Sequence, residues 1–575
     1  MTGSDPALLA ASGHDGASPP TTGRPADLPP VTGGPAPTTS AISRHPWLVF
    51  FAVLPGVFVT LADATIMSVA IPKIIRELDA SVTGVSWVMN GYNLVLTVLF
   101  LPMGRLADRY GHRRLFLVGL AVFTAASIGC AYSGTLTALV AFRVAQAVGA
   151  AAVVPTALTL LLAAFPAGRQ GFAAGLFGMA STLAAALGPT LGGLLIERWS
   201  WPAIFWFNLP VGIAGLALAA AVLPRVRVPN PLPLDLPGLA LSSAGLVCLT
   251  LALIQANDWG WTSAVTLGLF AGAALFLALF VWRELSAAHP VFDLHLFRDR
   301  TFASASAAIM TVDVAMMGCM FMLVIYMEAA MDYTTLRAAL VVTAVPAAAF
   351  VLAPFSGRLV DRIGPRPPAV AGALLSAAGL FLLGRLLRTA PTEAVVWRTA
   401  LVGLGLGFSL PAFTAAGMSA VPAAARGVGS GMLNTARQLG FLLGVALLVA
   451  IFAHTLVTAV NSAADQSQAM AEAAVLSPQV ESTLTQALDE ARDINPTVGF
   501  TELRRIANPV AEALSGMASG LEAFQLLALK DRIENLFWDE VAGAFGWPFT
   551  VAALFALVSV VPGLLLPRRL PRHDD

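Results

Sequence analysis

Gly-Arg-Leu-Ala-Asp-Arg-Tyr-Gly-His-Arg-Arg, residues 104–114, is a short charged segment between two long apolar stretches. A related segment, Gly-Arg-Leu-Val-Asp-Arg-Ile-Gly-Pro-Arg, occupies residues 357–366. Two copies of one charged hairpin between apolar stretches indicate an internal repeat and therefore two related halves. In each copy, the aspartate can accept hydrogen bonds from the N-terminus of a neighbouring helix, whose dipole favours negative charge there.

The candidate residues of both hairpins are of three kinds. The glycines allow a neighbouring helix to approach closely, the aspartates accept hydrogen bonds, and the arginines hold the loop on one side of a membrane. In the first hairpin they are Gly104, Arg105, Asp108, Arg109, Gly111, Arg113 and Arg114. In the second hairpin, which has one arginine fewer, they are Gly357, Arg358, Asp361, Arg362 and Gly364. The alternative is that these charges only anchor the loop and have no role in movement.

The composition is that of a membrane protein. Of its 575 residues, 57% are hydrophobic and only 11% are charged, whereas soluble domains have about a quarter charged residues. No basic stripe lies outside the loops, so nothing supports nucleic-acid binding. No nucleotide-binding loop, zinc-peptidase motif or nucleophile elbow occurs, and we therefore expect no enzyme, no cofactor and no metal site.

Fourteen stretches are apolar and long enough to cross a bilayer, which takes about 20 residues. They lie near residues 47–71, 84–103, 115–132, 136–160, 171–195, 203–223, 236–256, 264–282, 302–327, 336–356, 369–387, 394–415, 429–453 and 547–566. The two hairpins begin 253 residues apart, but six spans with short loops need only about 180–200 residues. We assign the surplus to two additional spans at 236–282.

The first hairpin resembles the loop between helices 2 and 3 of the major facilitator superfamily, and the span count resembles its fourteen-helix drug/proton antiporters. The resemblance implies an all-α polytopic membrane protein of two six-helix bundles plus two extra central helices. The expected parts are a disordered cytoplasmic tail at 1–45, the N-terminal bundle at 46–224, two additional helices with loops at 225–290, helices 9–13 of the C-terminal bundle at 291–455, an acidic extracytoplasmic helical insert at 456–545, the final transmembrane helix at 546–567 and a cytoplasmic tail at 568–575.

Positively charged loops remain on the cytoplasmic side, so the arginine-rich hairpins and both termini are expected there. Three arginines near the outer loop between spans 11 and 12 are exceptions: Arg385, Arg388 and Arg398. The insert at 456–545 has 13 acidic and 5 basic residues, a net charge of −8. Apolar residues at helical spacing over 503–521 favour two to four amphipathic helices that cap the outer mouth. The alternative is a flexible acidic loop.

Charges inside a bilayer are costly and usually face a cavity or a partner. Asp63 lies in Leu-Ala-Asp-Ala-Thr-Ile-Met-Ser-Val-Ala-Ile-Pro, residues 61–72, which is similar to the first-helix motif of these antiporters, although Ser68 replaces an asparagine. The resemblance implies a role for Asp63 in substrate or proton coupling. The alternative is a structural aspartate that caps a neighbouring helix.

Arg143 lies in the fourth span, in a stretch similar to the family's fourth-helix motif, whose arginine is implicated in proton transfer. At about 1.5 Å of rise per residue, Asp63 and Arg143 both fall in the outer half of the membrane. A direct or water-bridged pair is therefore possible. The alternative is that Arg143 is a structural clamp between helices.

A second pair of candidates lies in the C-terminal half. Asp313 in the ninth span and Arg437 in the thirteenth lie at similar depths, close to the middle of the membrane. Two interpretations stay open. Asp313 either faces a cavity, where it attracts a cationic drug, or forms a structural pair with Arg437.

The fifth span contains a glycine-rich stretch around Gly-Pro-Thr-Leu-Gly-Gly. Its candidate residues are Gly178, Gly188, Pro189, Gly192 and Gly193. Proline removes a backbone donor and bends a helix, and glycines allow another helix to pack closely against the bend. The stretch resembles the antiporter motif of drug exporters, which implies export by exchange. The alternative is helix packing without directional meaning.

We therefore expect proton-coupled efflux of lipophilic, cationic drugs or toxic compounds. The expected partners of the protein are protons, lipophilic small molecules and the lipid bilayer. The excess of arginine over lysine is typical of a GC-rich bacterial genome, which favours a bacterial cytoplasmic membrane. One alternative is a dedicated exporter of a single self-made metabolite, such as an antibiotic, lipid or siderophore. Another is a non-transporting scaffold or sensor that binds an envelope partner through 456–545.

Overall fold

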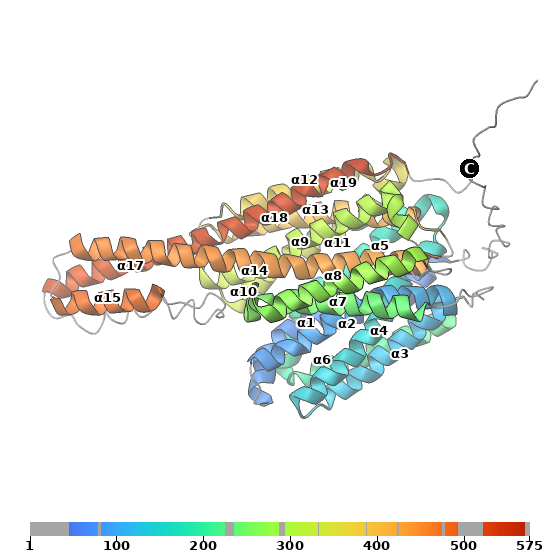
Figure 1. The fold of residues 1–575 in the computed structure, drawn as a ribbon, viewed down its shortest axis with the longest axis horizontal. Coiled ribbons are helices and arrows are strands. Elements are labelled where there is room, and N and C mark those ends of the chain that lie inside the picture. Colours follow the sequence, from blue (N-terminus) through green and yellow to red (C-terminus); the bar gives the residue numbers. More distant parts are fainter. Residues whose placement is uncertain are drawn as a thin grey trace, which may run out of the picture. The chain divides into compact units, whose positions relative to one another are not determined.

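The computed structural model describes residues 45–78, 82–224, 235–286, 294–331, 333–386, 388–422, 425–473, 478–492 and 521–569. Over these ranges the chain is helical, and fourteen helices are long and apolar enough to cross a membrane (Figure 1). Each overlaps one of the expected stretches, so the expected span count is confirmed. The expected tail at 1–45 lies outside the described residues, except for His45.

Six helices form the N-terminal half. They are α1 (Pro46–Glu77), α2 (Val82–Tyr110), α3 (His112–Ala131), α4 (Leu136–Ala164), α5 (Gln170–Arg198) and α6 (Pro202–Val222). The helix α4 is apolar on all sides, and a helix of this kind is stable only when other helices surround it. It packs against α1, α2, α3 and α5, and this central position allows its few polar residues to meet those of several neighbours.

Two additional helices follow, α7 (Leu236–Trp259) and α8 (Ala264–Ser286). They pack against each other, and α7 also contacts α2 of the N-terminal half and α14 of the C-terminal half. The Arg283 guanidinium binds the Asp235 carboxylate through Nε and Nη2 at 3.1–3.3 Å, which joins the end of α8 to the beginning of α7. Hydrogen bonds from Arg283 hold the pKa of Asp235 below its usual value.

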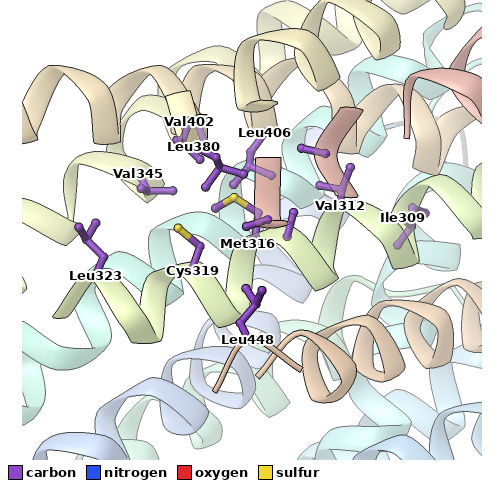
Figure 2. Close-up of a cluster of buried hydrophobic side chains, with 14 of the residues drawn as sticks. Ile309, Val312, Met316, Cys319, Leu323, Val345, Leu380, Val402, Leu406 and Leu448 are labelled. Carbon is purple, nitrogen blue, oxygen red and sulfur yellow. The ribbon is translucent and has the colours of Figure 1, made fainter. Parts of the chain in front are cut away.

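The C-terminal half consists of α9 (Arg300–Ala329), α10 (Thr335–Val342), α11 (Ala344–Ile363), α12 (Arg366–Leu383), α13 (Thr392–Ser419), α14 (Arg426–Ala473), α18 (Gly546–Val558) and α19 (Val560–Leu565). Its core is organised along α9. The residues Ile309, Val312, Met316, Cys319 and Leu323 recur every three or four positions and therefore share one face of α9. Figure 2 shows them among side chains of the neighbouring helices, including Val345, Leu380, Val402, Leu406 and Leu448.

The described part of the insert is helical, as expected, and its position as a cap over the outer mouth stays a prediction. The helix α14 continues past the expected end of the span near 453 to Ala473, and α15 (Pro478–Arg492) and α17 (Leu521–Ala544) pack along it (Figure 1). Polar contacts hold this packing: Gln466 binds Glu540 at 3.0 Å, and Arg492 binds Asp465 at 2.6 Å. Of the apolar series expected over 503–521, only Leu521 is among the described residues.

Arg388, one of the exceptions to the charge rule, contacts this acidic insert. Its Nη2 donates to Asn535 Oδ1 at 2.7 Å, and its Nε lies 3.4 Å from Asp539 Oδ1. Both partners belong to α17. The unexpected positive charge of the loop between α12 and α13 therefore has a local counter-charge.

Both hairpins lie at one end of the helix bundle, together with the first turns of α5 and α14. Thr159 near the end of α4 also donates to the Arg426 carbonyl at 3.3 Å, which ties α4 to the start of α14. We call this the hairpin end. The opposite end, toward which α14 extends into the insert, is the insert end.

Candidate functional site

Asp63 of α1 and Arg143 of α4 form a direct ion pair between Oδ2 and Nη1. Their side chains are 0% and 1% exposed, so neither charge is solvated in this conformation. Removing one partner of a buried pair strands the other charge, which usually destabilises a protein by about 3–5 kcal/mol. The structure thus brings together two residues that lie 80 positions apart and that the sequence could place only at similar depths.

Two amides complete the hydrogen bonding of this pair. Gln146 accepts from Arg143 Nη1 at 2.7 Å and donates to Asp63 Oδ1 at 3.3 Å and to Ser127 Oγ at 2.7 Å. Asn208 of α6 donates from Nδ2 to Asp63 Oδ1 at 2.9 Å. The Asp63 carboxylate therefore accepts from α4 and α6 at once, as a buried anion requires.

Helix α2 covers the guanidinium. Arg143 Nε donates to the Val88 carbonyl at 3.2 Å, and its guanidinium carbon lies 4.2 Å from the centre of the Tyr92 ring. The Tyr92 hydroxyl donates to the Thr60 carbonyl at 3.0 Å, which returns the network to α1. We call Asp63, Arg143, Gln146, Asn208, Ser127 and Tyr92 the N-half polar cluster.

Four members of this cluster were not predicted from the sequence: Gln146, Asn208, Ser127 and Tyr92. A signal existed for two of them. Gln146 follows Arg143 by three positions and so lies on the same face of α4. Asn208 is a lone amide in the apolar stretch from Phe205 to Pro210.

The second pair, Asp313 of α9 and Arg437 of α14, is also brought together, but loosely. Arg437 Nε lies 3.5 Å from Asp313 Oδ2, and neither of these atoms makes a hydrogen bond with a described residue. The Asp313 side chain is 6% exposed and that of Arg437 is 30% exposed. Nearby, Gln438 donates to Asn93 Oδ1 of α2 at 3.1 Å and so joins the two halves.

The first hairpin binds the opposite half through Asp108. Its Oδ1 accepts from the Gly427 amide at 2.7 Å and its Oδ2 from the Val428 amide at 2.8 Å, at the N-terminus of α14. These amides are among the donors that a helix leaves unpaired at its start, where the dipole favours an anion. Gly104 lies directly against the Gly427 carbonyl, where any side chain would collide.

The second hairpin makes the same contact in reverse. Asp361 accepts from the Gly171 amide at 2.8 Å and from the Phe172 amide at 2.9 Å, at the N-terminus of α5. Gly357 lies against the Gly171 carbonyl. Each half thus presents an aspartate to the second and third residues of a helix in the other half. We call these two contacts the Asp108 latch and the Asp361 latch.

The remaining hairpin residues support the turns and the loop positions. Gly111 and Gly364 have φ angles of 96° and 89°, a left-handed conformation that favours glycine. Arg113 donates to the Ala220 carbonyl of α6 at 2.7 Å, and Arg358 lies 4.6 Å from the Phe172 ring centre. Arg109 lies near the Tyr110 ring, Arg105 is buried, and the side chains of Arg114 and Arg362 are exposed.

The glycine-rich stretch of α5 has two separate contacts. Gly188 lies against Thr65 and the Ala62 carbonyl of α1, and Gly192 lies against Ile66, so both meet the helical turn around Asp63. A Cβ on Gly178 would instead lie 3.7–3.8 Å from Pro411 and Ala353 in the C-terminal half. A Cβ on Gly193 would have no atom of another described segment within 4 Å, so Gly193 does not take part in close packing. Pro189 lies within α5.

Comparison with known proteins identifies the family. Residues 53–445 match the sequence profile of the Major Facilitator Superfamily. The tetracenomycin C resistance and export protein of Streptomyces glaucescens is 32% identical over 533 residues, which cover 92% of this chain and 94% of that protein. The multidrug resistance protein Stp of Mycobacterium tuberculosis is 35% identical over 418 residues, which cover 72% of this chain and 77% of that protein.

Among solved structures, the human organic anion transporter MFSD10 has a similar fold. The TM-score is 0.51 at 14% sequence identity, and the match covers 72% of this chain and 93% of that one. The family profile spans both hairpins and both ion pairs, and the fourteen helices follow the expected layout. The chain therefore belongs to the Major Facilitator Superfamily.

Proposed function

We propose that the protein is a proton-coupled exporter of lipophilic, cationic compounds, located in a bacterial cytoplasmic membrane with its hairpin end and both termini in the cytoplasm. The observation that carries the proposal is the buried ion pair between Asp63 and Arg143. Intramembrane carboxylates of this kind are typical of proton pathways in transporters. A proton that neutralises Asp63 would leave the Arg143 charge without its counter-charge, so protonation favours a different arrangement of α1 and α4.

The packing of α5 supports a connection between protonation of Asp63 and the Asp361 latch. Gly188 and Gly192 pack against the turn of α1 that carries Asp63, and the start of the same helix is bound by Asp361 of the opposite half. A rearrangement around Asp63 can therefore reach the Asp361 latch through one rigid helix. Transporters of this class expose a central site alternately as one half rocks against the other.

Both latches are closed in this structure, so the hairpin end is joined across the halves. In the proposed cycle, opening of the latches admits the substrate from the cytoplasm or the inner leaflet. Closure of the latches and separation at the insert end release the substrate outside. A proton taken up by Asp63 from outside then favours the return.

The cationic character of the substrate is supported by Asp313. It is a buried carboxylate whose Oδ2 accepts no hydrogen bond from a described residue, and its partner Arg437 is partly exposed. A carboxylate that is only loosely paired can exchange Arg437 for a positively charged ligand more easily than Asp63 can exchange Arg143. We therefore assign substrate attraction to Asp313 and proton coupling to Asp63.

The test is efflux of an ethidium-type fluorescent cation from energised cells, with and without a protonophore. We expect Asp63→Asn to abolish efflux while the protein still accumulates in the membrane, because the amide cannot carry a proton. Asp258→Asn is the matched control, since Asp258 is an exposed carboxylate at the end of α7 and should leave efflux unchanged. Wild-type rates of proton-driven efflux in Asp63→Asn would refute the coupling role.

A second candidate is a dedicated exporter of one self-made metabolite. The observation that favours it is the relative named as a tetracenomycin C resistance and export protein, which matches 92% of this chain. The unmatched part is shorter than the insert at 456–545, so that relative shares at least part of the insert. Well-expressed wild type that exports no ethidium, but lowers the cellular level of an endogenous product, would favour this candidate.

A further inference from the structure

Asn208 uses the donor end of its side-chain amide but not the acceptor end. Its Nδ2 donates to Asp63 Oδ1 at 2.9 Å, but its own Oδ1 is buried and accepts no hydrogen bond from a described residue. Buried carbonyl oxygens are normally paired, because an unpaired one loses its bond to water without replacement. The unpaired oxygen is therefore available to a donor that another state of the cluster would supply.

Protonation of Asp63 creates such a state. The ionised carboxylate has only acceptors, so its neighbours are the donors Arg143, Gln146 and Asn208. A protonated carboxyl has an O–H that needs an acceptor. Arg143 has no acceptor atom, and the two lone pairs of Gln146 Oε1 already accept from Arg143 at 2.7 Å and from the Cys130 thiol at 3.9 Å.

The geometry points to Asn208 as that acceptor. We propose that Asn208 is a positioning residue for both protonation states of Asp63. Its amide donates to the carboxylate, and after a rotation of about 180° around its last bond its carbonyl oxygen accepts from the acid. This inference rests on the proposed role of Asp63 as proton carrier. A hydronium ion of the outer solution gives its proton to an Asp63 oxygen and becomes water, Arg143 loses its counter-charge, and no covalent bond to Asn208 changes.

The other groups around Asp63 matter because any of them that titrates would also affect the protonation of Asp63. Helix α4 presents Arg143, α2 presents Tyr92, and α3 presents Cys130, whose Sγ lies 3.9 Å from Gln146 Oε1. A phenol and a thiol are ordinarily uncharged near neutral pH. Helix α5 faces this turn with Gly188 and Gly192, which do not titrate. Arg143 is therefore the one full charge among the described residues that touch Asp63.

The first experiment is an infrared titration of the purified protein, in which the carboxylic acid band missing from Asp63→Asn reports Asp63. In Asn208→Leu, which has similar size and no polar group, we expect this band to appear at a pH about one unit higher. The reason is that the carboxylate loses a charge-assisted hydrogen bond, whereas the acid loses a weaker neutral one. An Asp63 band that titrates as in the wild type would overturn the proposal.

The second experiment compares proton-driven efflux in Asn208→Leu and Asn208→Ser. A hydroxyl can donate or accept by rotation, so serine should recover much of an activity that falls about tenfold or more in the leucine variant. Equal losses in both variants, with wild-type titration, would mean that Asn208 only fills space and would overturn the proposal. Asn208→Ala removes the same polar groups and replaces the leucine variant if that protein does not accumulate.

The two proposals fail separately. If wild-type efflux does not depend on the proton gradient, the proposed function is wrong. The infrared titration does not require transport, and it still shows whether Asn208 responds to the protonation of Asp63.

Discussion

Each half of the molecule has a pair of opposite charges between two of its transmembrane helices, but the two halves hold these pairs differently. In the N-terminal half, Asp63 and Arg143 are in direct contact, fully buried and surrounded by hydrogen-bonding partners. In the C-terminal half, Asp313 and Arg437 are 3.5 Å apart, their facing atoms make no hydrogen bond with a described residue, and the Arg437 side chain is partly exposed. The two halves thus share the arrangement of helices but differ in how closely their ion pairs are held.

The latches show the opposite behaviour. Asp108 and Asp361 bind equivalent amides of α14 and α5 at distances that differ by about 0.1 Å or less. The contact between halves is therefore symmetric, while the interior of each half is not. We infer that movement is shared by both halves and that proton coupling belongs to the N-terminal half. The following predictions test this comparison in order of expected effect.

The largest difference between the two halves is expected in the loss of stability when the arginine of each ion pair is removed. Arg143→Met leaves Asp63 buried without a counter-charge and should lower the free energy of unfolding by about 3–5 kcal/mol. Arg437→Met should lower it by about 1 kcal/mol or less, because its contact with Asp313 is loose and the Arg437 side chain is partly exposed. Thermal unfolding of the purified proteins in detergent measures both.

A double variant controls this result. Asp63→Leu combined with Arg143→Met replaces both charges with apolar groups and should recover most of the stability without recovering proton-driven efflux. Equal destabilisation by the two single arginine variants would contradict the distinction between the pairs.

The latches should respond alike. Asp108→Asn or Asp361→Asn removes a charge that accepts two hydrogen bonds at a helix start, and each should weaken closure by about 1.5–3 kcal/mol. The reporter is Ser430→Cys, at a fully buried position near the start of α14. Its alkylation by a polar reagent from the hairpin end should accelerate by about tenfold or more in either variant.

The same protein without the Ser430→Cys change supplies the background from Cys130, Cys248 and Cys319. Acceleration in only one of the two latch variants would show that the latches are not equivalent.

Packing between α5 and α1 is expected to matter at one glycine and not at the next. A side chain at Gly192 would meet Ile66 at 3.0–3.2 Å, so Gly192→Val should destabilise the protein by about 1–3 kcal/mol and reduce efflux. Gly193→Val is the matched control, because nothing lies within 4 Å of that position. Unfolding and efflux of the two variants are compared side by side, and similar losses would refute a specific contact with the Asp63 turn.

The smallest effect is expected at the ion pair between Asp235 and Arg283. The pKa of Asp235 is lowered by hydrogen bonds from Arg283. Its stabilising effect is therefore present at neutral pH and disappears only as the pH falls through that lowered value. Asp235→Asn should lower the melting temperature slightly, by an amount that stays constant between about pH 5 and 8. A difference that grows or vanishes within this range would show that Asp235 titrates there.

The sequence alone predicted the features that depend on local chemistry. Hydrophobic length along the chain is enough to locate a membrane span, so the fourteen spans and the two extra helices agree with the structure. The repeated hairpin also predicted that Asp108 can accept hydrogen bonds at the start of a helix, because the helix dipole favours an anion there. The candidate charges could be identified from the sequence because a charged residue is rare within an apolar span.

Only the tertiary structure decided which residues meet. Asp108 binds Gly427, 319 positions away, and the cluster around Asp63 combines residues of α1, α2, α3, α4 and α6. Such contacts depend on the rotation and crossing of several helices, which hydrophobic patterns do not encode. For this reason Asn208 was not predicted, Gly193 was grouped with the packing glycines, and the packing of α15 and α17 along α14 was not predicted.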